Sequence, residues 1–346
     1  MFKNQGILMD IRICKECGFI LGTRPNSKDK DGVCLACHNK DRKNQINWQE
    51  RQNWLTQYLK ERKNPSSNYD VLVGVSGGKD SCAIVKRLIE NHGVAPSRIL
   101  LVHVMDEFTP SKAGLYNLDN LVKTFDVDLI NFRLAPKTFV KETRKSFFEE
   151  LHPLKWIEAQ LYAKPLEVAK AYQIPTVFMG ENFDFEYGVS EECGIFHSSS
   201  SDEVNVIFLG SIWPYSNTDS LKQARQIGFK SLSDFDDWQR QGSADDYTQI
   251  DSIGYMIQHW TKFIKFGFQR VSDLACRFVR EGVMSKEQAL RLIKDKDWVC
   301  DPAAKKDFCR TIGISEDEFN ATVDKFANKD LLVKDENGNW RRRDLI

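Results

Sequence analysis

The amino-acid sequence predicts an α/β fold in which a parallel sheet carries helices on both faces. Two observations predict the sheet: from Tyr69 onward short apolar runs alternate with helical patterns, and the runs recur at intervals of about 28 residues. A third observation is that the chain reads as helices alone after about Ser220. At ~150 residues per domain, the 346 residues correspond to about two domains.

The amino-acid composition indicates a globular protein and argues against several other classes of protein. Apolar residues make up 41% of the chain and charged residues 28%, which argues against disorder. Lysine plus arginine equals aspartate plus glutamate at 49 each, so no overall basic field predicts a nucleic-acid partner. No apolar run approaches the ~18 residues of a membrane helix, and the one at the N-terminus is too short for a secretory signal. We expect a cytoplasmic protein without a membrane partner.

The first 45 residues contain few large apolar side chains and two CxxC pairs. Nine cysteines in a chain without an export signal make a poor disulfide framework. Two CxxC pairs at this separation are typical of a closed, structural zinc site, which would hold together a segment too small for its own core. Gly18 and Gly32 supply the freedom that the tight turns need. The predicted zinc ligands are Cys14, Cys17, Cys34 and Cys37.

The sheet is predicted from five apolar runs bounded by turn residues. Their near-continuous apolar character fits strands that are buried on both faces, and helical spacing between them indicates right-handed crossovers. Cys82, Val85, Leu88 and Ile89 show that spacing after the first run. The predicted strands are 71–75, 99–105, 127–134, 175–180 and 204–210.

Helices are predicted on both sides of the sheet region. A basic helical stretch, 48–63, precedes it. Several of the later helices open with a serine or aspartate cap followed by glutamate or glutamine, the capping-box pattern. These later helices are predicted at 231–241, 252–268, 271–282, 285–295 and 315–328.

The strongest chemical signal is SGGKDS, residues 76–81, which follows the first predicted strand and opens a helix. Two glycines allow close backbone approach to a ligand, and the helix N-terminus presents unpaired N–H groups to an anion. A Walker A loop is excluded, because Val73 and Asp80 stand where glycine and serine or threonine would be required. The loop therefore predicts an oxyanion cradle of another type.

This loop resembles the PP-loop of the ATP pyrophosphatases. The resemblance implies that ATP is cleaved between its α- and β-phosphates, that AMP passes to a substrate oxygen, and that the loop holds pyrophosphate. HVMD, ending at Asp106, resembles the adenosine-side element of that family, although Asp106 could equally form a strand-end turn. The implied catalytic residues are Lys79, Asp80 and Ser81, and the implied ATP-binding residues are Ser76, Gly77, Gly78, Lys79, Asp80, Ser81 and Asp106.

A cluster of acidic and amide side chains follows the fourth predicted strand. Carboxyl ends of parallel strands meet at one edge, so the cluster should lie near the loop. Mg²⁺ prefers hard oxygen ligands from carboxylates and phosphates. Gly180, Glu181, Asn182 and Asp184 are candidates for metal or adenylate contact, and Asp184, Glu186 and Tyr187 for substrate contact. The alternative is a solvated acidic loop.

Nearly the whole chain resembles the N-acetyl sugar amidotransferases. The resemblance rests on the paired CxxC, SGGKDS, GENFDFEYG, LGSIWPYSNTDSLKQARQIGF, KFIKFGFQRVSD and REGVMSKEQALRLIKDKD. It implies a role in bacterial lipopolysaccharide, O-antigen or nonulosonic-acid biosynthesis, in which an acetamido group on a nucleotide sugar is adenylated and its oxygen replaced by ammonia. Lys265 and Arg270, within the basic and aromatic run 260–270, would grip the nucleotide-sugar diphosphate; the alternative is a helix with a basic solvent face.

The chain shows no glutaminase of its own. A glutaminase needs an activated cysteine, and none of the remaining cysteines stands in a G-x-C-x-G elbow or at the N-terminus. The resemblance implies that ammonia comes from a separate glutaminase subunit like that of histidine biosynthesis, with a cyclase-like companion. The expected cofactors and co-substrates are ATP, Mg²⁺ and Zn²⁺.

Two other functions stay open at this stage. A tRNA-thiolating PP-loop enzyme would need further paired cysteines, which the chain lacks, although residues 1–64 carry 13 basic and 7 acidic side chains. An adaptor would bind ATP without cleaving it. We divide the chain into a zinc-binding knuckle (1–45), a helical linker (46–68), a PP-loop ATP pyrophosphatase domain (69–220) and a helical region for substrate or partner (221–346).

Overall fold

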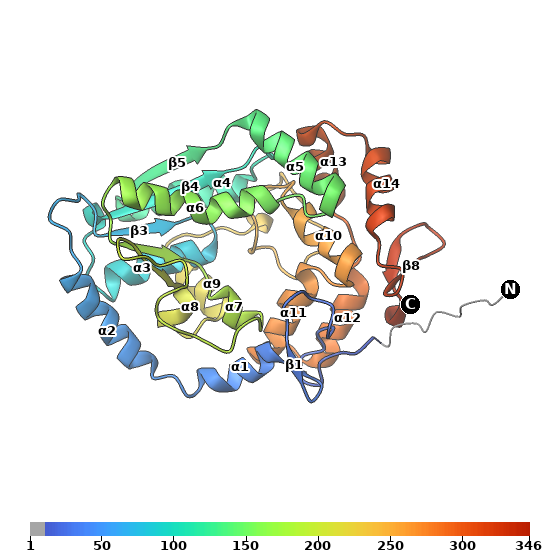
Figure 1. Ribbon diagram of the computed structural model, residues 1–346, viewed down its shortest axis with the longest axis horizontal. Helices are drawn as coiled ribbons and strands as arrows, with labels where there is room; N and C mark the ends of the chain where they lie inside the picture. Colours follow the sequence, from blue (N-terminus) through green and yellow to red (C-terminus); the bar gives the residue numbers. More distant parts are fainter. Residues whose placement is uncertain (1–10) are drawn as a thin grey trace.

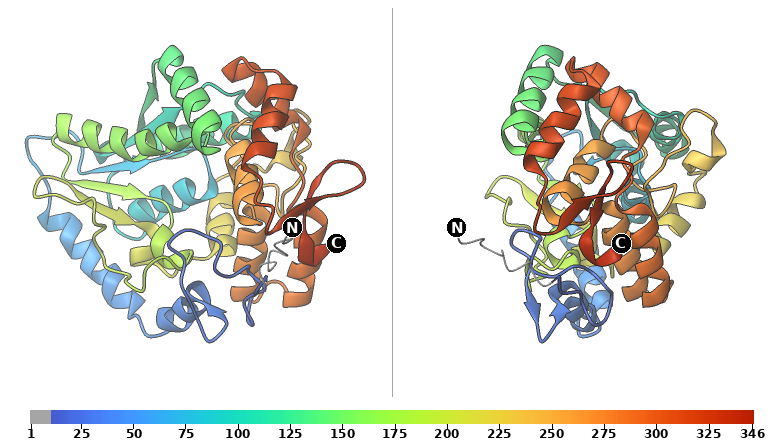
Figure 2. Two further views of the ribbon diagram at one scale, coloured as in Figure 1. Left: turned by 45° about the vertical axis from the view of Figure 1, so that its right-hand side comes forward. Right: turned by 90° about the vertical axis from the view of Figure 1, so that its right-hand side faces the viewer.

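The architecture is organised around a five-stranded sheet with the strand order β5-β4-β3-β6-β7. A computed structural model describes residues 11–346 (Figures 1 and 2). The first ten residues, which contain most of the N-terminal run judged too short for a signal, lie outside the described residues. The strands are β1 Asp29–Lys30, β2 Val33–Cys34, β3 Val71–Gly74, β4 Ile99–Met105, β5 Asp128–Arg133, β6 Thr176–Met179, β7 Asn205–Phe208, β8 Leu332–Lys334 and β9 Trp340–Arg342.

Helices surround this sheet and continue beyond it. They are α1 Leu35–Lys43, α2 Trp48–Glu61, α3 Lys79–Glu90, α4 Lys112–Phe125, α5 Pro136–Glu150, α6 Lys155–Ala171, α7 Phe183–Glu186, α8 Leu209–Ile212, α9 Asn217–Arg225, α10 Met256–Phe266, α11 Arg270–Arg280, α12 Lys286–Lys296, α13 Pro302–Ile312 and α14 Glu316–Phe326. Short 3₁₀ turns span Pro96–Arg98, Leu232–Asp234 and Arg343–Leu345. Among the described residues, no helix has both the length and the apolar character needed to cross a membrane.

The predicted fold class is confirmed. Each of the five predicted runs is a strand, all neighbouring strands are parallel, and Val71 of β3 pairs with Ile99 of β4 on one side and Thr176 of β6 on the other. Helix α6 contacts one face of the sheet and α3 lies below the other, with α9 packed on α3 (Figure 1). The central strands are therefore buried on both faces, as their continuous apolar sequence requires.

The sheet changes its direction of growth between β3 and β6. The chain runs outward from β3 to β4 and β5, then returns to place β6 and β7 on the other side of β3. In open α/β sheets, ligands bind outside the carboxyl ends of the strands at such a switch point. The topology thus directs attention to the residues after Gly74 and after Met179.

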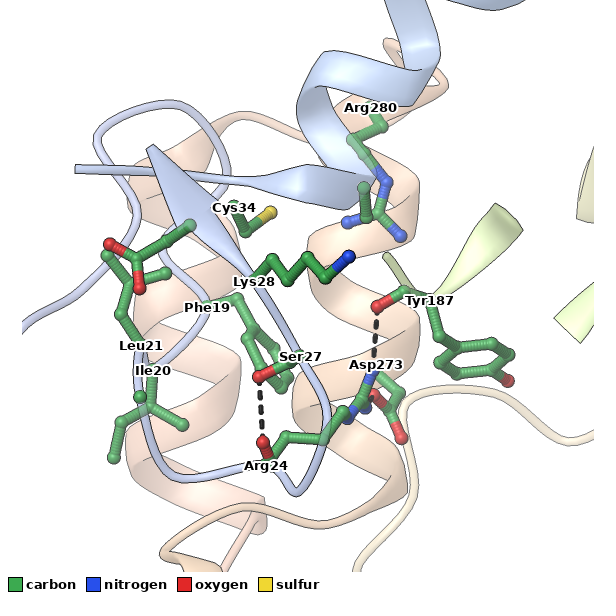
Figure 3. A pocket seen from close by; sticks show the side chains of 13 residues that line it. Phe19, Ile20, Leu21, Arg24, Ser27, Lys28, Cys34, Tyr187, Asp273 and Arg280 are labelled. Carbon is green, nitrogen blue, oxygen red and sulfur yellow. Dashed lines mark hydrogen bonds and ion pairs between the residues drawn. The ribbon is translucent and has the colours of Figure 1, made fainter. Parts of the chain in front are cut away.

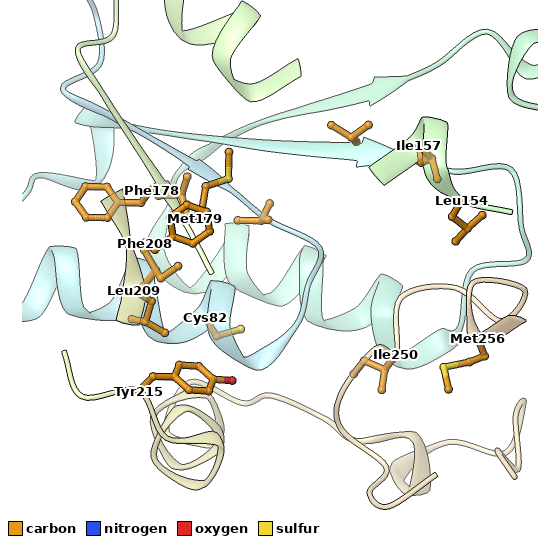
Figure 4. Close-up of a cluster of buried hydrophobic side chains, with 14 of the residues drawn as sticks. Cys82, Leu154, Ile157, Phe178, Met179, Phe208, Leu209, Tyr215, Ile250 and Met256 are labelled. Atoms are coloured by element: carbon orange, nitrogen blue, oxygen red, sulfur yellow. The ribbon is translucent and has the colours of Figure 1, made fainter. Parts of the chain in front are cut away.

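The core beneath this edge is closely packed. Phe178 is fully buried, and Met179 and Phe208 almost fully; Figure 4 shows them gathered with Cys82 of α3. Cys82 is fully buried and its pKa is raised to about 12 by burial, so it is an inert apolar side chain. All nine cysteines fall within the described residues and all are free.

The helical C-terminal region agrees with the sequence in part. The four predicted helices after residue 250 are α10, α11, α12 and α14, and Ser285 and Ser315 form the expected capping boxes. The helix predicted at 231–241 is wrong: only a 3₁₀ turn forms, because its polar groups bond to distant segments instead. The side chains of Asp236 and Asp237 bind Lys112, and Trp238 lies within hydrogen-bonding distance of Asp301.

Two elements of this region were missed by the sequence analysis. Helix α13 begins with Asp301 as N-cap and Pro302 in its first turn, a start signal that was readable. The hairpin of β8 and β9 turns at Gly338, which has φ +78°. Strands this short carry too little alternation to be recognised from the sequence.

The stretch expected to act as a linker packs against the sheet edge. Leu55 of α2 is fully buried, and the Tyr58 hydroxyl lies 3.1 Å from Thr176 of β6 and accepts a bond from Asn205 of β7. The cysteine-rich segment before it lies beside α11 and α12, which are remote in sequence (Figures 1 and 2). Lys286 of α12 donates to the carbonyl of Lys15 there.

Candidate active site

A cavity of about 300 Å³ lies at the switch point between β3 and β6. Its walls come from both halves of the chain: the glycine loop and the ends of β3, β4 and β6 on one side, and a segment before α10 on the other. Its volume suits a small-molecule ligand. Lining residues include Ser76, Gly78, Lys79, Asp80, Ser81, Tyr162, Gly180, Glu181, Phe183, Tyr247, Thr248, Gln249, Asp251, Tyr255 and Arg270.

The loop 76–81 has the conformation of an anion cradle. Gly77 has φ +80°, and a Cβ there would lie 2.9 Å from the carbonyl oxygen of Gly114, so no other residue fits without strain. Gly78 is the N-cap of α3 and provides no side-chain cap. The first N–H groups of α3 are therefore available to a negatively charged ligand at the pocket floor.

Lys79 is enclosed at the edge of the pocket. Only 3% of its side chain is exposed. Its Nζ donates to Asp80 at 2.7 Å and to the hydroxyl of Tyr215 at 3.2 Å. Both partners lie beside the pocket, so the ammonium is fixed in position before a ligand arrives.

One carboxylate oxygen of Asp80 is available to a ligand or cation. Its Oδ2 accepts from Lys79, whereas its buried Oδ1 has no hydrogen-bond partner among residues 11–346. A buried carboxylate oxygen without a partner is costly unless a ligand or cation completes it. Asp80 therefore fits a divalent cation at the mouth of the loop.

A second charged pair was not predicted. Arg277 of α11 forms an ion pair with Glu181, which follows β6. Burial raises the pKa of the Glu181 carboxyl, but the positive charges of Arg277, Arg270 and Lys79 outweigh it and lower that pKa to about 2. Glu181 is thus held as a carboxylate at the pocket wall.

Aromatic rings fix Arg277 in place. Its guanidinium lies 4.7 Å from the ring centroid of Tyr187 and 5.0 Å from that of Tyr215. Burial raises the pKa of Tyr215 well above its ordinary value, and the charges of Asp80 and Glu181 raise it further, so its hydroxyl stays protonated. The helical spacing of arginines in 270–280 was a signal for this role that the sequence analysis did not use.

The other candidates after β6 divide into two groups. Gly180 and Glu181 line the pocket, and no heavy atom lies within 4 Å of the position a Cβ would take on Gly180. Asn182 caps α7 by accepting from the amide of Phe185 at 3.2 Å, and Asp184 lies outside the lining. Asn182 therefore shapes the turn after the strand.

The predicted substrate residues are likewise separated. Arg270 lines the pocket and bonds to the Tyr187 hydroxyl, which is buried behind it. Glu186 pairs with Lys43 of α1 at 2.6 Å and faces the cysteine-rich segment. Lys265 donates to the carbonyl of Glu150 at 3.2 Å, outside the pocket. The structure does not bring Glu186 or Lys265 to this pocket.

The run 260–270 does not form one gripping surface. Trp260 turns toward α14 and donates to the carbonyl of Trp298 at 3.0 Å, while Arg270 faces the pocket. Helix α10 ends at Phe266, and Gly267 with φ +74° reverses the chain before α11. Residues on the two sides of this turn therefore point to different places.

Asp106 lies behind the pocket wall. Its carboxylate accepts from the amide of Phe108 at 2.9 Å and from the hydroxyl of Ser252 at 2.6 Å. Burial raises the pKa of Asp106 to about 6. One oxygen therefore forms the turn after β4, and the other joins this turn to the segment before α10.

The four predicted metal ligands come together. The sulfurs of Cys14, Cys17, Cys34 and Cys37 all lie within 4.8 Å of one another, at 3.8 Å for Cys14–Cys37 and 3.7 Å for Cys17–Cys34. Four thiolates at about 2.3 Å from a tetrahedral zinc ion are about 3.8 Å apart, so the cluster fits Zn²⁺. Arg280 donates to the Cys17 sulfur, which balances thiolate charge.

The segment that carries these cysteines is fastened to α11. Figure 3 shows Arg24 between Phe19, Tyr187 and Asp273. Its guanidinium lies 4.7–5.0 Å from the ring centroids of Phe19, Tyr187 and Phe268, forms an ion pair with Asp273, and donates to the carbonyl of Tyr187. This partly buried contact joins the cysteine-rich segment to the helix that carries Arg277.

Fold and site together define an α/β protein with a glycine-rich anion loop and a switch-point pocket, which residues of the helical C-terminal region help to line. Residues 233–344, about a third of the chain, match the family described as "LPS biosynthesis protein WbpG-like, C-terminal domain". The C-terminal region is therefore similar to this domain, which supports the resemblance to proteins of lipopolysaccharide biosynthesis.

Other comparisons give more distant similarity. An NH3-dependent NAD synthetase from Campylobacter jejuni is 14% identical, with a TM-score of 0.34 over 53% of this chain and 75% of that one. NMN synthetase from Francisella tularensis is 14% identical, with a TM-score of 0.33 over 70% of this chain and 96% of that one. Comparison with curated protein sequences gives no match.

Proposed function

We propose that the protein is an ATP-dependent amidotransferase of lipopolysaccharide biosynthesis, which converts the N-acetyl group of a nucleotide sugar into an acetamidino group. The observation that carries the proposal is one pocket with two walls. The anion cradle of residues 76–81 forms one wall, and a domain of the WbpG-like family forms the other. A phosphate-binding loop facing a domain of lipopolysaccharide biosynthesis supports the activation of a sugar by ATP.

The loop wall accounts for ATP cleavage. The first N–H groups of α3, the hydroxyls of Ser76 and Ser81, and the fixed ammonium of Lys79 offer donors to the departing pyrophosphate. Such preorganised donors stabilise charge that develops as the bond between the α- and β-phosphates breaks. Asp80 and Glu181 would hold Mg²⁺, which supplies charge neutralisation on the phosphates when it is bound.

The chemistry balances in two steps. The acetamido oxygen attacks the α-phosphorus, pyrophosphate leaves, and the product is an O-adenylated imidate. Ammonia then adds to the imidate carbon, the C–O bond to AMP breaks, and one proton is released. The acetamidino sugar therefore carries nitrogen in place of the acetamido oxygen, which leaves on AMP. The pocket must exclude water during this sequence, because water would regenerate the acetamide.

Ammonia must come from elsewhere. None of the residues that line the pocket is a cysteine, so this site provides no thiol for glutamine hydrolysis. We propose that a glutaminase subunit like that of histidine biosynthesis, with a cyclase-like companion, delivers ammonia to the pocket. Because no cysteine lines the pocket, the site also argues against a tRNA-thiolating enzyme, which needs a thiol near its adenylated base.

The test is incubation of the purified chain with ATP, Mg²⁺, ammonium and a panel of N-acetylated nucleotide sugars, followed by mass spectrometry. We expect AMP, pyrophosphate and a sugar in which NH replaces one oxygen. ATP that is bound but not cleaved in the presence of every sugar would support the adaptor. Sulfur incorporation into tRNA would support thiolation.

A further inference from the structure

The wall opposite the glycine loop is a short irregular segment of the WbpG-like domain. The residues of this segment that face the cavity form no helix or strand before α10; they are Tyr247, Thr248, Gln249, Asp251 and Tyr255. The loop 76–81 on the other side supplies the donors for phosphate, so this wall is available to a second substrate.

The segment is held rigidly by a buried ion pair. Arg240 and Asp245 have side chains only 3% exposed. The Arg240 guanidinium donates to the carbonyl oxygens of Thr248 and Gln249 at 2.6 and 2.9 Å. On the other side, the amide of Ser111 donates to the carbonyl of Asp251 at 3.0 Å. Both ends of the wall are thus fixed.

The backbone of Gln249 is strained in this arrangement. Its φ is +50°, a left-handed conformation that side chains with a Cβ rarely adopt. Only its carbonyl oxygen takes part in hydrogen bonds among the described residues, and glycine would provide that carbonyl without strain. The position therefore retains a side chain for a reason other than folding.

Three polar groups of this wall have no partner on another residue among residues 11–346. The Gln249 amide group and the Tyr247 hydroxyl form no hydrogen bond, and the Asp251 carboxylate interacts only with its own backbone N–H, although all three residues line the cavity. They offer mostly acceptors, whereas the loop wall offers donors. A ring with several hydroxyl groups satisfies such acceptors, and a phosphate does not.

We propose that Gln249 and Asp251 select the acceptor by binding the hydroxyl groups of its N-acetylated sugar ring. This rests on the proposed function. Gln249 is the specificity-determining residue, and the strain at its backbone places its amide in the cavity. The loop 76–81 binds ATP independently of this contact.

The experiment compares full-length variants for binding of two probes, ATP with Mg²⁺ and UDP-N-acetylglucosamine, by calorimetry and saturation-transfer NMR. Gln249→Gly and Gln249→Ala should each weaken UDP-N-acetylglucosamine about tenfold, as expected for one lost hydrogen bond, with ATP affinity unchanged. Gln249→Gly should also raise Tm by about 1 °C, because it removes the strain. Gln239→Ala, an exposed glutamine on the same loop, is the matched control and should change nothing.

Three results would overturn the inference. They are equal sugar binding by wild type and both Gln249 variants, a lower Tm for Gln249→Gly, or no binding of the sugar by a wild-type protein that binds ATP. Failure of the wild-type protein to bind ATP would instead contradict the proposed function. The two failures are therefore distinguishable.

Discussion

The two walls of the pocket differ in how the chain builds them. The loop wall is contiguous: six consecutive residues, 76–81, which run from the turn after β3 into the first turn of α3, supply the glycines, the lysine and the hydroxyls. The opposite wall is assembled from a strained segment at 247–251, from Arg270, and from Arg277 behind them. The comparison teaches that the ATP-binding half depends on local backbone geometry, whereas the acceptor half depends on tertiary packing.

Lys79→Ala should have the largest effect on this comparison. Loss of one fixed cation at the developing charge should reduce pyrophosphate release ~10²–10³-fold. The protein should remain folded, because Tyr215 can still donate to Asp80. Pyrophosphate assays with circular dichroism check both points, and Lys86→Ala on the same helix is the control, since Lys86 pairs with Glu90 away from the pocket. Release at a near wild-type rate would show that the loop is not the site of ATP cleavage.

Arg277→Met tests whether the packed wall supports the loop wall. It leaves the Glu181 carboxylate buried without its partner, which should lower stability by about 3–5 kcal/mol. Adding Glu181→Gln should restore much of that stability without restoring activity, because Gln cannot replace the charge. Denaturant unfolding of the four proteins of this cycle measures the coupling. Additive losses of stability would mean that the pair is not coupled.

Cys14→Ser probes the cysteine-rich segment that packs on α11. It should remove zinc, expose residues 11–45 to proteolysis, and leave the sheet intact, because none of the four cysteines lies in a strand of that sheet or in α3 or α6, which cover its faces. Metal analysis should find one zinc per wild-type chain, and limited proteolysis should find the variant cleaved only in this segment. Absence of zinc from protein purified without chelator would contradict the assignment.

Replacing Asp106 should have the smallest effect. It should change only how the stability of the protein depends on pH. Its pKa is raised to about 6 by burial, so between about pH 4 and 6 the folded state binds more protons than the unfolded state. This group therefore makes the protein less stable as pH rises through that window. Asp106→Asn should flatten the dependence between pH 4 and 6, measured by thermal unfolding, whereas exposed Asp295→Asn should not. An unchanged slope would show that Asp106 titrates as in the unfolded chain.

The sequence predicted the parts of the molecule whose signals are local. Five apolar runs fixed the strands to within one or two residues, and paired CxxC predicted a cluster whose sulfurs do meet. The wrong helix at 231–241 failed because its aspartates and Trp238 form long-range contacts, which no local pattern records. Arg277 was missed for the same reason: its partner is Glu181, 96 residues away in the chain.

The path of the acetamido oxygen tests the central claim most directly. A sugar that supports turnover is prepared with ¹⁸O in its acetamido group and incubated with the purified chain, ATP, Mg²⁺ and ammonium at alkaline pH. Alkaline pH is needed because only neutral ammonia has a lone pair to attack the imidate. The account predicts that the label appears in AMP and that the acetamidino product carries none. Label retained in the sugar product, or equal turnover with glutamine alone as nitrogen donor, would contradict it.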